Sequence, residues 1–199
     1  MAAFTAKDVA ELRSRTGAGM MDCKNALEEA QGNMDKAVEH LRAKGSAKAD
    51  KRAGRSTSEG VIGSYVHHNG KIAVLVELGC ETDFVARTDD FQQLAKSLAE
   101  HVAAAAPIAV DKDQVSPEKV ESERRIFVEQ VKSSGKPDHM IDKIVDGKLE
   151  AFYKDVALMH QAWVREPKKT ISDLVKEVSA KTGENIQVKR FVRYQLGET

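Results

Sequence analysis

The chain has few of the residues that stabilise small extracellular domains or hold metal ions. Its only two cysteines, Cys23 and Cys80, are far apart and show no CxxC spacing. This pattern indicates neither a disulfide framework nor a zinc site. We expect both to be reduced, small hydrophobic residues, and we expect no bound metal and no cofactor.

An excess of charge of one sign and long apolar runs are also absent. The 31 basic residues balance the 31 acidic ones. A general nucleic-acid binder normally carries a basic excess that displaces phosphate counterions, so this class is disfavoured. No apolar run approaches the roughly 20 residues that span a bilayer, and Lys7, Asp8 and Glu11 interrupt any signal-peptide pattern. We expect a cytoplasmic protein that does not bind membranes.

Sequences that bind nucleotide phosphates are missing as well. There is neither a GxxxxGK[ST] loop nor a GxGxxG turn, so the chain is not expected to bind a nucleotide directly. A hydrolase would have to use Cys80, or the pair His67 and His68, and no third group that would orient such a pair is identifiable. That alternative stays open as a less favoured reading.

Residues 1–44 predict a domain of three short helices. Thr5 can cap the first, with Asp8 as its partner in a capping box. Gly17 and Gly19 end that helix, a second follows over about 22–30, and a third begins after the next turn. The apolar positions at helical spacing are Val9, Leu12, Ala26, Leu27, Ala37, Val38 and Leu41. So small a bundle has little core and is commonly devoted to a partner surface.

Residues 45–58 carry basic side chains against a single acidic one, Asp50. Together with its Gly and Ser content, this predicts a basic linker. Two alternatives are a helical segment over 47–53 and contact with RNA through the basic run.

From residue 59 onward the pattern predicts an α+β core that extends to residue 199. Residues 61–67 and 72–78 alternate in hydrophobicity around Asn69 and Gly70, which is typical of a hairpin with a tight two-residue turn. Helices are predicted from about residues 89, 117, 138 and 171, and alternation over 186–196 predicts a last strand. The fold class is therefore α+β: a three-stranded antiparallel sheet packed with helices, behind a helical module and a linker.

Two separate blocks resemble the elongation factor Ts family. Residues 77–86 have the sequence ELGCETDFVA, and residues 16–27 have the sequence TGAGMMDCKNAL, preceded by Leu12 and Arg13. Both blocks occur in the family's order, and the resemblance covers essentially the full chain. One departure is Gly79, where the family usually has a polar or branched residue, so a looser backbone is expected there.

The resemblance implies a guanine-nucleotide exchange factor that has no catalytic chemistry of its own. Its partner would be elongation factor Tu, both GDP-bound and nucleotide-free. The resemblance further implies that the helical module is ubiquitin-associated-like and docks on that partner. The implied docking residues are Arg13, Gly19, Met20, Met21 and Lys24. We expect one of the two methionines to point inward and one outward.

The second block implies how the nucleotide would be released. The turn formed by Thr82, Asp83, Phe84 and Val85 would enter the partner near the phosphates and dislocate the magnesium ion. Without the resemblance, the local pattern favours a Phe84 packed into the protein's own core. The alternative function is an RNA-binding accessory protein of the translation machinery. Longer family members carry two copies of the sheet unit and this chain has room for one, so a homodimer formed through the sheet is predicted.

Overall fold

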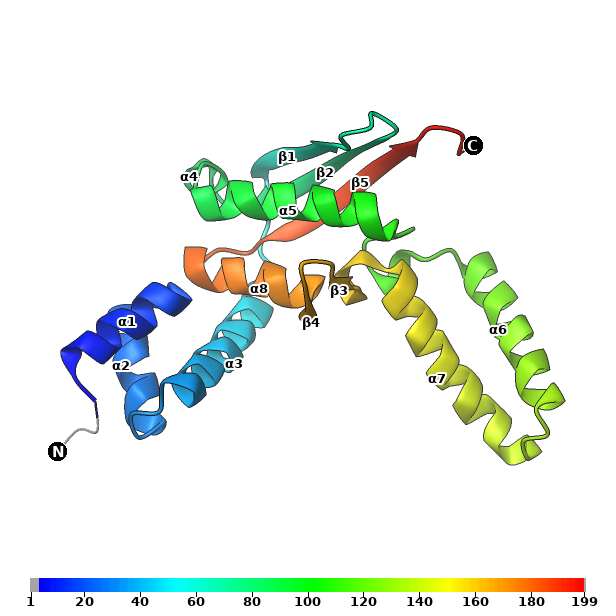
Figure 1. The fold of residues 1–199 in the computed structure, drawn as a ribbon, viewed down its shortest axis with the longest axis horizontal. Coiled ribbons are helices and arrows are strands. Elements are labelled where there is room, and N and C mark those ends of the chain that lie inside the picture. Colours follow the sequence, from blue (N-terminus) through cyan, green and yellow to red (C-terminus); the bar gives the residue numbers. More distant parts are fainter. Residues whose placement is uncertain (1–3, 199) are drawn as a thin grey trace. The chain divides into compact units, whose positions relative to one another are not determined.

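The computed structural model describes residues 4–198 (Figure 1). The chain forms two compact units, each assembled from segments that are distant in sequence. The first unit takes in the chain up to Ile62, Leu78–Ala95 and Asp173–Gln187; the second takes in Gly63–Glu77, Lys96–Ser172 and the chain from Val188 onward. The predicted α+β class is confirmed. The division into 1–44, 45–58 and 59–199 stays a prediction.

The amino-terminal helices form as their capping residues predict. They are α1 (Ala6–Thr16), α2 (Met20–Glu29) and α3 (Met34–Arg52). Thr5 and Asp8 make the capping box, and Gly17 ends α1 with a positive φ of 68°. The apolar positions share one small core, made of Val9, Leu12, Cys23, Ala26, Leu27, Ala30, Ala37 and Leu41.

Helix α3 is longer than predicted, because it continues without interruption to Arg52. The first part of the segment 45–58 is therefore helical and not a coil. Gly45 is tolerated inside the helix because α8 (Ile171–Thr182) passes close to it: a Cβ at Gly45 would lie 3.0 Å from the Cβ of Ala180. Ala49 is buried, so packing overrides the polar, Gly-containing composition.

The predicted sheet is present, with strand order β1-β2-β5. Its strands are β1 (Glu59–Val66), β2 (Ile72–Cys80) and β5 (Gln187–Gln195). The hairpin is confirmed, but its turn is not the two-residue type. The amide of Gly70 donates to the His67 carbonyl at 2.8 Å, and His67 in turn donates to Ile72. Only Gly70 has a positive φ there, and the Asn69 side chain accepts from Lys71 N at 2.9 Å.

The backbone at the start of the second block is closely packed. A Cβ added at Gly60 would lie 2.1 Å from the Leu78 carbonyl oxygen and 2.9 Å from the Gly79 Cα. Gly79 is itself a buried residue of β2. The expected looseness at Gly79 is therefore absent, because this residue belongs to a strand and faces a close neighbour.

The remaining helices lie near their predicted positions. They are α5 (Asp89–Ala105), α6 (Pro117–Ser133), α7 (Asp138–Val156) and α8. Ser116 caps α6, and Val131, Ile141, Val145 and Leu149 form a separate core between α6 and α7. In the part of the chain that the structure describes, no helix has both the length and the apolar content needed to cross a membrane.

Three short elements were not predicted. A second hairpin pairs β3 (Ala162–Trp163) with β4 (Glu166–Thr170), and single 3-10 turns occupy Lys112–Gln114 and Leu158–His160. A two-residue strand is too short to show an alternating pattern, and Pro167 argues against a strand where β4 lies.

A buried histidine joins this second hairpin to α5. His101 is fully buried; its Nε2 lies 2.9 Å from Gln161 Oε1, and its Nδ1 accepts from the Val164 amide at 3.3 Å. Since an amide oxygen can only accept, Nε2 carries the proton and the ring is neutral. Burial lowers the pKa of His101, which agrees with this assignment.

We predict that His101 makes folding stability sensitive to mild acid. Because its folded pKa is depressed, its contribution is present above the unfolded value of about 6.5 and is lost as the pH falls through the folded value. The free energy of unfolding should therefore fall further for the parent than for His101→Gln between about pH 7.5 and pH 5. Urea titrations at both pH values would measure this. Equal losses would show that His101 is protonated in the folded protein.

Candidate partner-binding site

Strand β2 ends directly in a single helical turn, α4 (Asp83–Ala86). Thr82 is its N-cap: the hydroxyl accepts from the Val85 amide at 3.4 Å. The Thr82 carbonyl also accepts from the Ala86 amide at 3.2 Å. We call Thr82, Asp83, Phe84 and Val85 the exchange turn, after the role that the family resemblance implies for these residues.

The exchange turn presents Phe84 to solvent, with 79% of the residue exposed. The reading of the local pattern that packs this ring into the protein's core is wrong, because the helical turn places Val85 and Ala86 inward instead. Asp83 is partly exposed and pairs with Arg87 at 2.8 Å. The turn therefore projects an apolar ring next to a carboxylate.

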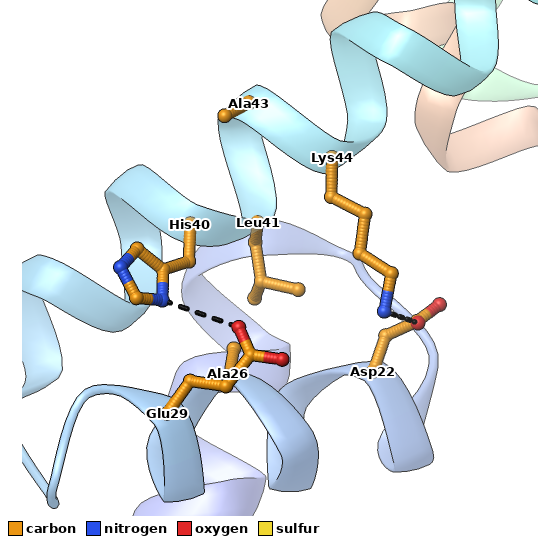
Figure 2. A pocket seen from close by; sticks show the side chains of 7 residues that line it. All are labelled: Asp22, Ala26, Glu29, His40, Leu41, Ala43 and Lys44. Atoms are coloured by element: carbon orange, nitrogen blue, oxygen red, sulfur yellow. Dashed lines mark ion pairs between the residues drawn. The ribbon is translucent and has the colours of Figure 1, made fainter.

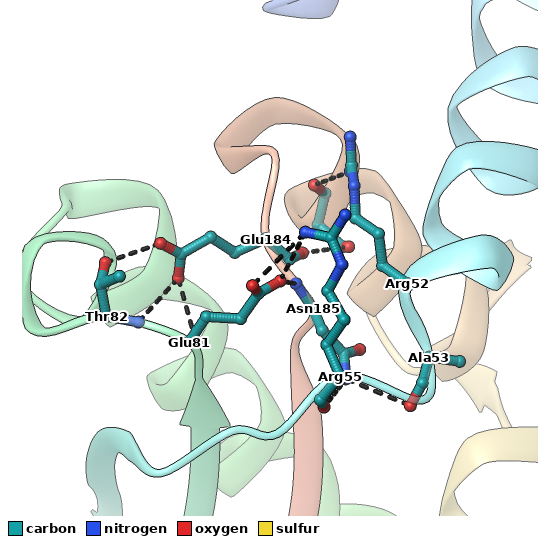
Figure 3. Close-up of polar contacts among 8 residues, drawn as sticks. Arg52, Ala53, Arg55, Glu81, Thr82, Glu184 and Asn185 are labelled. Carbon is teal, nitrogen blue, oxygen red and sulfur yellow. Dashed lines mark hydrogen bonds and ion pairs between the residues drawn. The ribbon is translucent and has the colours of Figure 1, made fainter.

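A distant carboxylate holds the start of the exchange turn (Figure 3). Glu184 Oε2 accepts from the amides of Glu81 and Thr82, each at 3.0 Å. Glu184 Oε1 accepts from the Thr82 hydroxyl at 2.6 Å. Both carboxylate oxygens of Glu184 are thus used on two adjacent residues.

The next residue, Asn185, ties the exchange turn to the end of α3. Its backbone amide donates to Glu81 Oε1 at 2.7 Å, and its side-chain amide donates to the carbonyls of Ala53 and Arg55 at 3.2 and 2.8 Å. Arg55 completes the arrangement with an ion pair to Glu81 at 3.4 Å. The Asn185 amide and then Arg55 lower the pKa of Glu81, so this side chain is ionised at neutral pH.

Cys80, just before the turn, is a structural residue. It is buried, it is not in a disulfide, and its thiol donates to the Thr82 carbonyl at 3.2 Å. Burial, and next the charge of Glu184, raise the pKa of the Cys80 thiol. A nucleophilic cysteine needs a lowered pKa and access to substrate, so the hydrolase reading loses its main support. Within residues 4–198, no group of three or more His, Cys, Asp or Glu side chains is placed to hold a metal ion.

The residues of the first block gather where α1 gives way to α2. Arg13, Gly19 and Lys24 are exposed, and both methionines point outward, with Met20 46% and Met21 65% exposed. The expectation that one methionine points inward is wrong. Cys23, Ala26 and Leu27 form the buried face of α2, so the inward position of its first turn is taken by Cys23 and not by a methionine.

A hollow of about 220 Å³ lies between α2 and α3 (Figure 2). The apolar part of its lining consists of Ala26, Leu41 and Ala43. Asp22 pairs with Lys44 at 3.0 Å, and Glu29 lies 3.4 Å from the His40 ring. Hydrogen bonds from Lys44 and Lys48 lower the pKa of Asp22. The Asp22–Lys44 ion pair links the two helices.

The basic run 44–55 is largely occupied by intramolecular contacts. Lys44 and Lys48 both bind Asp22. Arg52 donates to the Ser179 carbonyl at 3.3 Å, and Arg55 pairs with Glu81. Side chains engaged in this way are poorly placed to bind phosphates, which weakens the RNA-binding reading.

Comparison with known proteins assigns the chain to a family. A family model described as elongation factor TS matches residues 3–198. The chain belongs to the elongation factor Ts family. Among relatives named elongation factor Ts, that of Fervidobacterium nodosum is 58% identical over 98% of this chain and 99% of its own. That of Thermosipho melanesiensis is 55% identical over 98% and 100%, and that of Nitratidesulfovibrio vulgaris is 54% identical over 98% of each.

Membership of the elongation factor Ts family gives the chain a role in translation elongation. The exposed Met20 and Met21 of the first block and the exposed Phe84 of the second all lie on the first compact unit. Sequence reasoning missed Glu184 and Asn185. They lie directly after Gly183, which ends α8 with a φ of 78°, and nothing in their local pattern points to a segment about a hundred residues away.

We predict that the two phenylalanines nearest the exchange turn differ sharply in their effect on stability. Phe84→Ala should change the free energy of unfolding by no more than about 0.5 kcal/mol, because the ring is exposed. Phe91→Ala, at a fully buried position of α5, should cost about 3 to 5 kcal/mol. Chemical denaturation of both variants measures the difference. A large loss in Phe84→Ala would mean that this ring packs against the protein.

Proposed function

We propose that the chain is a cytoplasmic guanine-nucleotide exchange factor that binds elongation factor Tu and accelerates release of GDP. The observation that carries this proposal is the exchange turn, in which an exposed Phe84 stands beside Asp83 at the end of a rigid strand. Membership of the elongation factor Ts family supports the same partner. The chain would supply binding and displacement, and no catalytic chemistry of its own.

In this mechanism the exchange turn enters the partner near the phosphates and the magnesium ion. Asp83 and Phe84 would displace the groups that hold the metal, while the Thr82 cap and the buried Val85 keep the turn in shape. Magnesium requires near-ideal octahedral coordination, so small displacements of its surroundings are costly. GDP then loses a major counter-charge and dissociates faster.

Thermodynamic linkage explains why one turn is not sufficient. Each tenfold weakening of GDP binding requires about 1.4 kcal/mol of coupling, and GDP weakens the exchange factor's binding by the same factor. A second contact surface must therefore supply affinity. We assign that role to Arg13, Gly19, Met20, Met21 and Lys24, all of which are exposed.

This division of roles predicts different kinetic defects. In release of a fluorescent guanine nucleotide from elongation factor Tu, with magnesium present, Phe84→Ala should lower the maximum rate roughly tenfold or more. Met20→Gln should instead raise the half-saturating concentration roughly fivefold, which corresponds to a loss of about 1 kcal/mol of binding. Met140→Gln, at an exposed position on α7, is the matched control and should behave as the parent.

Three outcomes would count against this account. Equal stimulation by the parent and Phe84→Ala would assign the effect to docking alone. Identical defects in Phe84→Ala and Met20→Gln would remove the division of roles. No stimulation by the parent would disprove the exchange function, and tight, steeply salt-dependent binding to many RNA sequences would then favour the RNA-binding alternative.

We also propose that the chain forms a homodimer through its sheet. Several large apolar side chains of the second unit are exposed on or next to the strands: Val66, Leu75, Val192, Tyr194 and Leu196. On β2, Leu75 is exposed between the buried Val74 and Val76. Soluble proteins rarely leave such a group of residues uncovered, and a second copy would cover it.

Sedimentation equilibrium at micromolar concentration tests this proposal. The parent should be a dimer, and Tyr194→Glu should be a monomer because the interface would have to bury the new charge. Ile126→Glu, at an exposed position on α6, is the control and should remain a dimer. A parent that stays monomeric both alone and with its partner would refute the proposal.

A further inference from the structure

We propose that Glu184 is a positioning residue for exchange: its carboxylate fixes the exchange turn so that Phe84 is held outward before any partner binds. This inference rests on the proposed exchange function and adds a residue to it. Glu184 does not belong to either block that carries the family resemblance. Its side chain acts on the partner only through Thr82 and the helical turn that follows.

The hydrogen-bond geometry shows how the effect would be transmitted. Glu184 Oε1 accepts from the Thr82 hydroxyl at 2.6 Å, and that same hydroxyl oxygen accepts from the Val85 amide. The hydroxyl proton is therefore committed to Glu184 while a lone pair caps α4. Hydrogen bonds in such a chain polarise and strengthen one another, so the carboxylate supports the cap that starts the turn.

The exchange turn needs external support of this kind. Helix α4 has only four residues, and an isolated helix of that length is not stable in water. The partly buried amides of Glu81 and Thr82 would lose their acceptor if Glu184 were removed, and an amide shielded from water without an acceptor is costly. An exposed phenylalanine on an unsupported turn would be free to fold back onto apolar surface.

Glu184 is itself held in place by α8. The Ser179 hydroxyl donates to the Glu184 carbonyl, and Ile171, Val175 and Val178 bury the inner face of the helix. The same helix contacts α3 through ion pairs: Arg42 with Asp173 at 3.3 Å, and Asp50 with Lys176 at 2.8 Å. One helix therefore supports both the amino-terminal module and the exchange turn.

Two single substitutions at Glu184 distinguish the effect of side-chain length from the effect of charge. Glu184→Asp keeps the charge but is one methylene group too short to hold all three donors. Glu184→Gln loses the charge, but its amide oxygen can accept both amides, and its NH2 group can donate to the Thr82 hydroxyl, which keeps a second lone pair for the Val85 amide. In the nucleotide-release assay, Glu184→Asp should lower the maximum rate roughly tenfold, with a half-saturating concentration within about twofold of the parent. Glu184→Gln should recover most of the rate. Glu121→Gln, at an exposed position on α6, is the control for a lost surface charge.

A double-mutant cycle with Phe84→Ala gives a readout that a general loss of stability would not produce. If Glu184 acts only by presenting Phe84, Phe84→Ala with Glu184→Asp should be no slower than Phe84→Ala alone. Multiplied rate losses would overturn the inference. So would a Glu184→Asp defect confined to the half-saturating concentration, or a Glu184→Gln defect larger than that of Glu184→Asp, which would indicate a role of charge.

Failure of this inference can be told apart from failure of the proposed function. Suppose that the parent accelerates release, that Phe84→Ala is slow and that Glu184→Asp matches the parent. The exchange function is then supported, and the positioning role of Glu184 is disproved. If the parent does not accelerate release, the exchange function is disproved, and so is the positioning role that rests on it. Thermal unfolding of each variant, measured alongside, shows that the rates refer to folded protein.

Discussion

The proposed site depends on one constraint: the apolar ring of Phe84 must stay exposed to water at a fixed position. Burying a phenylalanine side chain is worth roughly 1.5 to 3 kcal/mol, so a Phe84 that is 79% exposed stays outward only if the backbone on both sides prevents its collapse. Strand β2 supplies one constraint, and the buried Val85 and Ala86 supply the other. Glu184 connects them, because its carboxylate accepts from the last residues before α4 and from the side chain that caps it.

The amino-terminal module is also held in place, through helix α3. Helix α3 continues to Arg52, and its Gly45 lies close to Ala180 of α8. Ion pairs at Asp50 and Asp173 lie along this contact. Individually such exposed pairs contribute little, but the close approach of Gly45 to Ala180 fixes the register of the two helices. The exposed methionines and the exchange turn belong to one compact unit, as the docking and displacement proposed above require.

Local features could be predicted from the sequence, and long-range ones could not. The Thr5 capping box, the hairpin around Gly70 and the Ser116 cap of α6 depend on residues a few positions apart, and all are present. The outward Phe84 contradicts the local pattern, because its position is set by Glu184, which is 102 residues from Thr82. The extension of α3 agrees with the alternative of a helical segment over 47–53, whereas the β3–β4 hairpin was missed because tertiary packing decides it, and not propensity. The two family blocks of the site could be located from the sequence. The hydrogen bonds from Glu184 and Asn185 that hold the second block could not.

The central claim is that the exchange turn is rigid in the free protein. The most direct test is native-state hydrogen exchange of the backbone amides of Glu81 and Thr82, resolved by NMR in the absence of any partner. The account predicts that both are protected nearly as strongly as the amides of the central strand β2, because Glu184 accepts from each of them. Exchange at the rate of an unstructured peptide would contradict it, since the turn would then open freely and Phe84 would have no fixed direction.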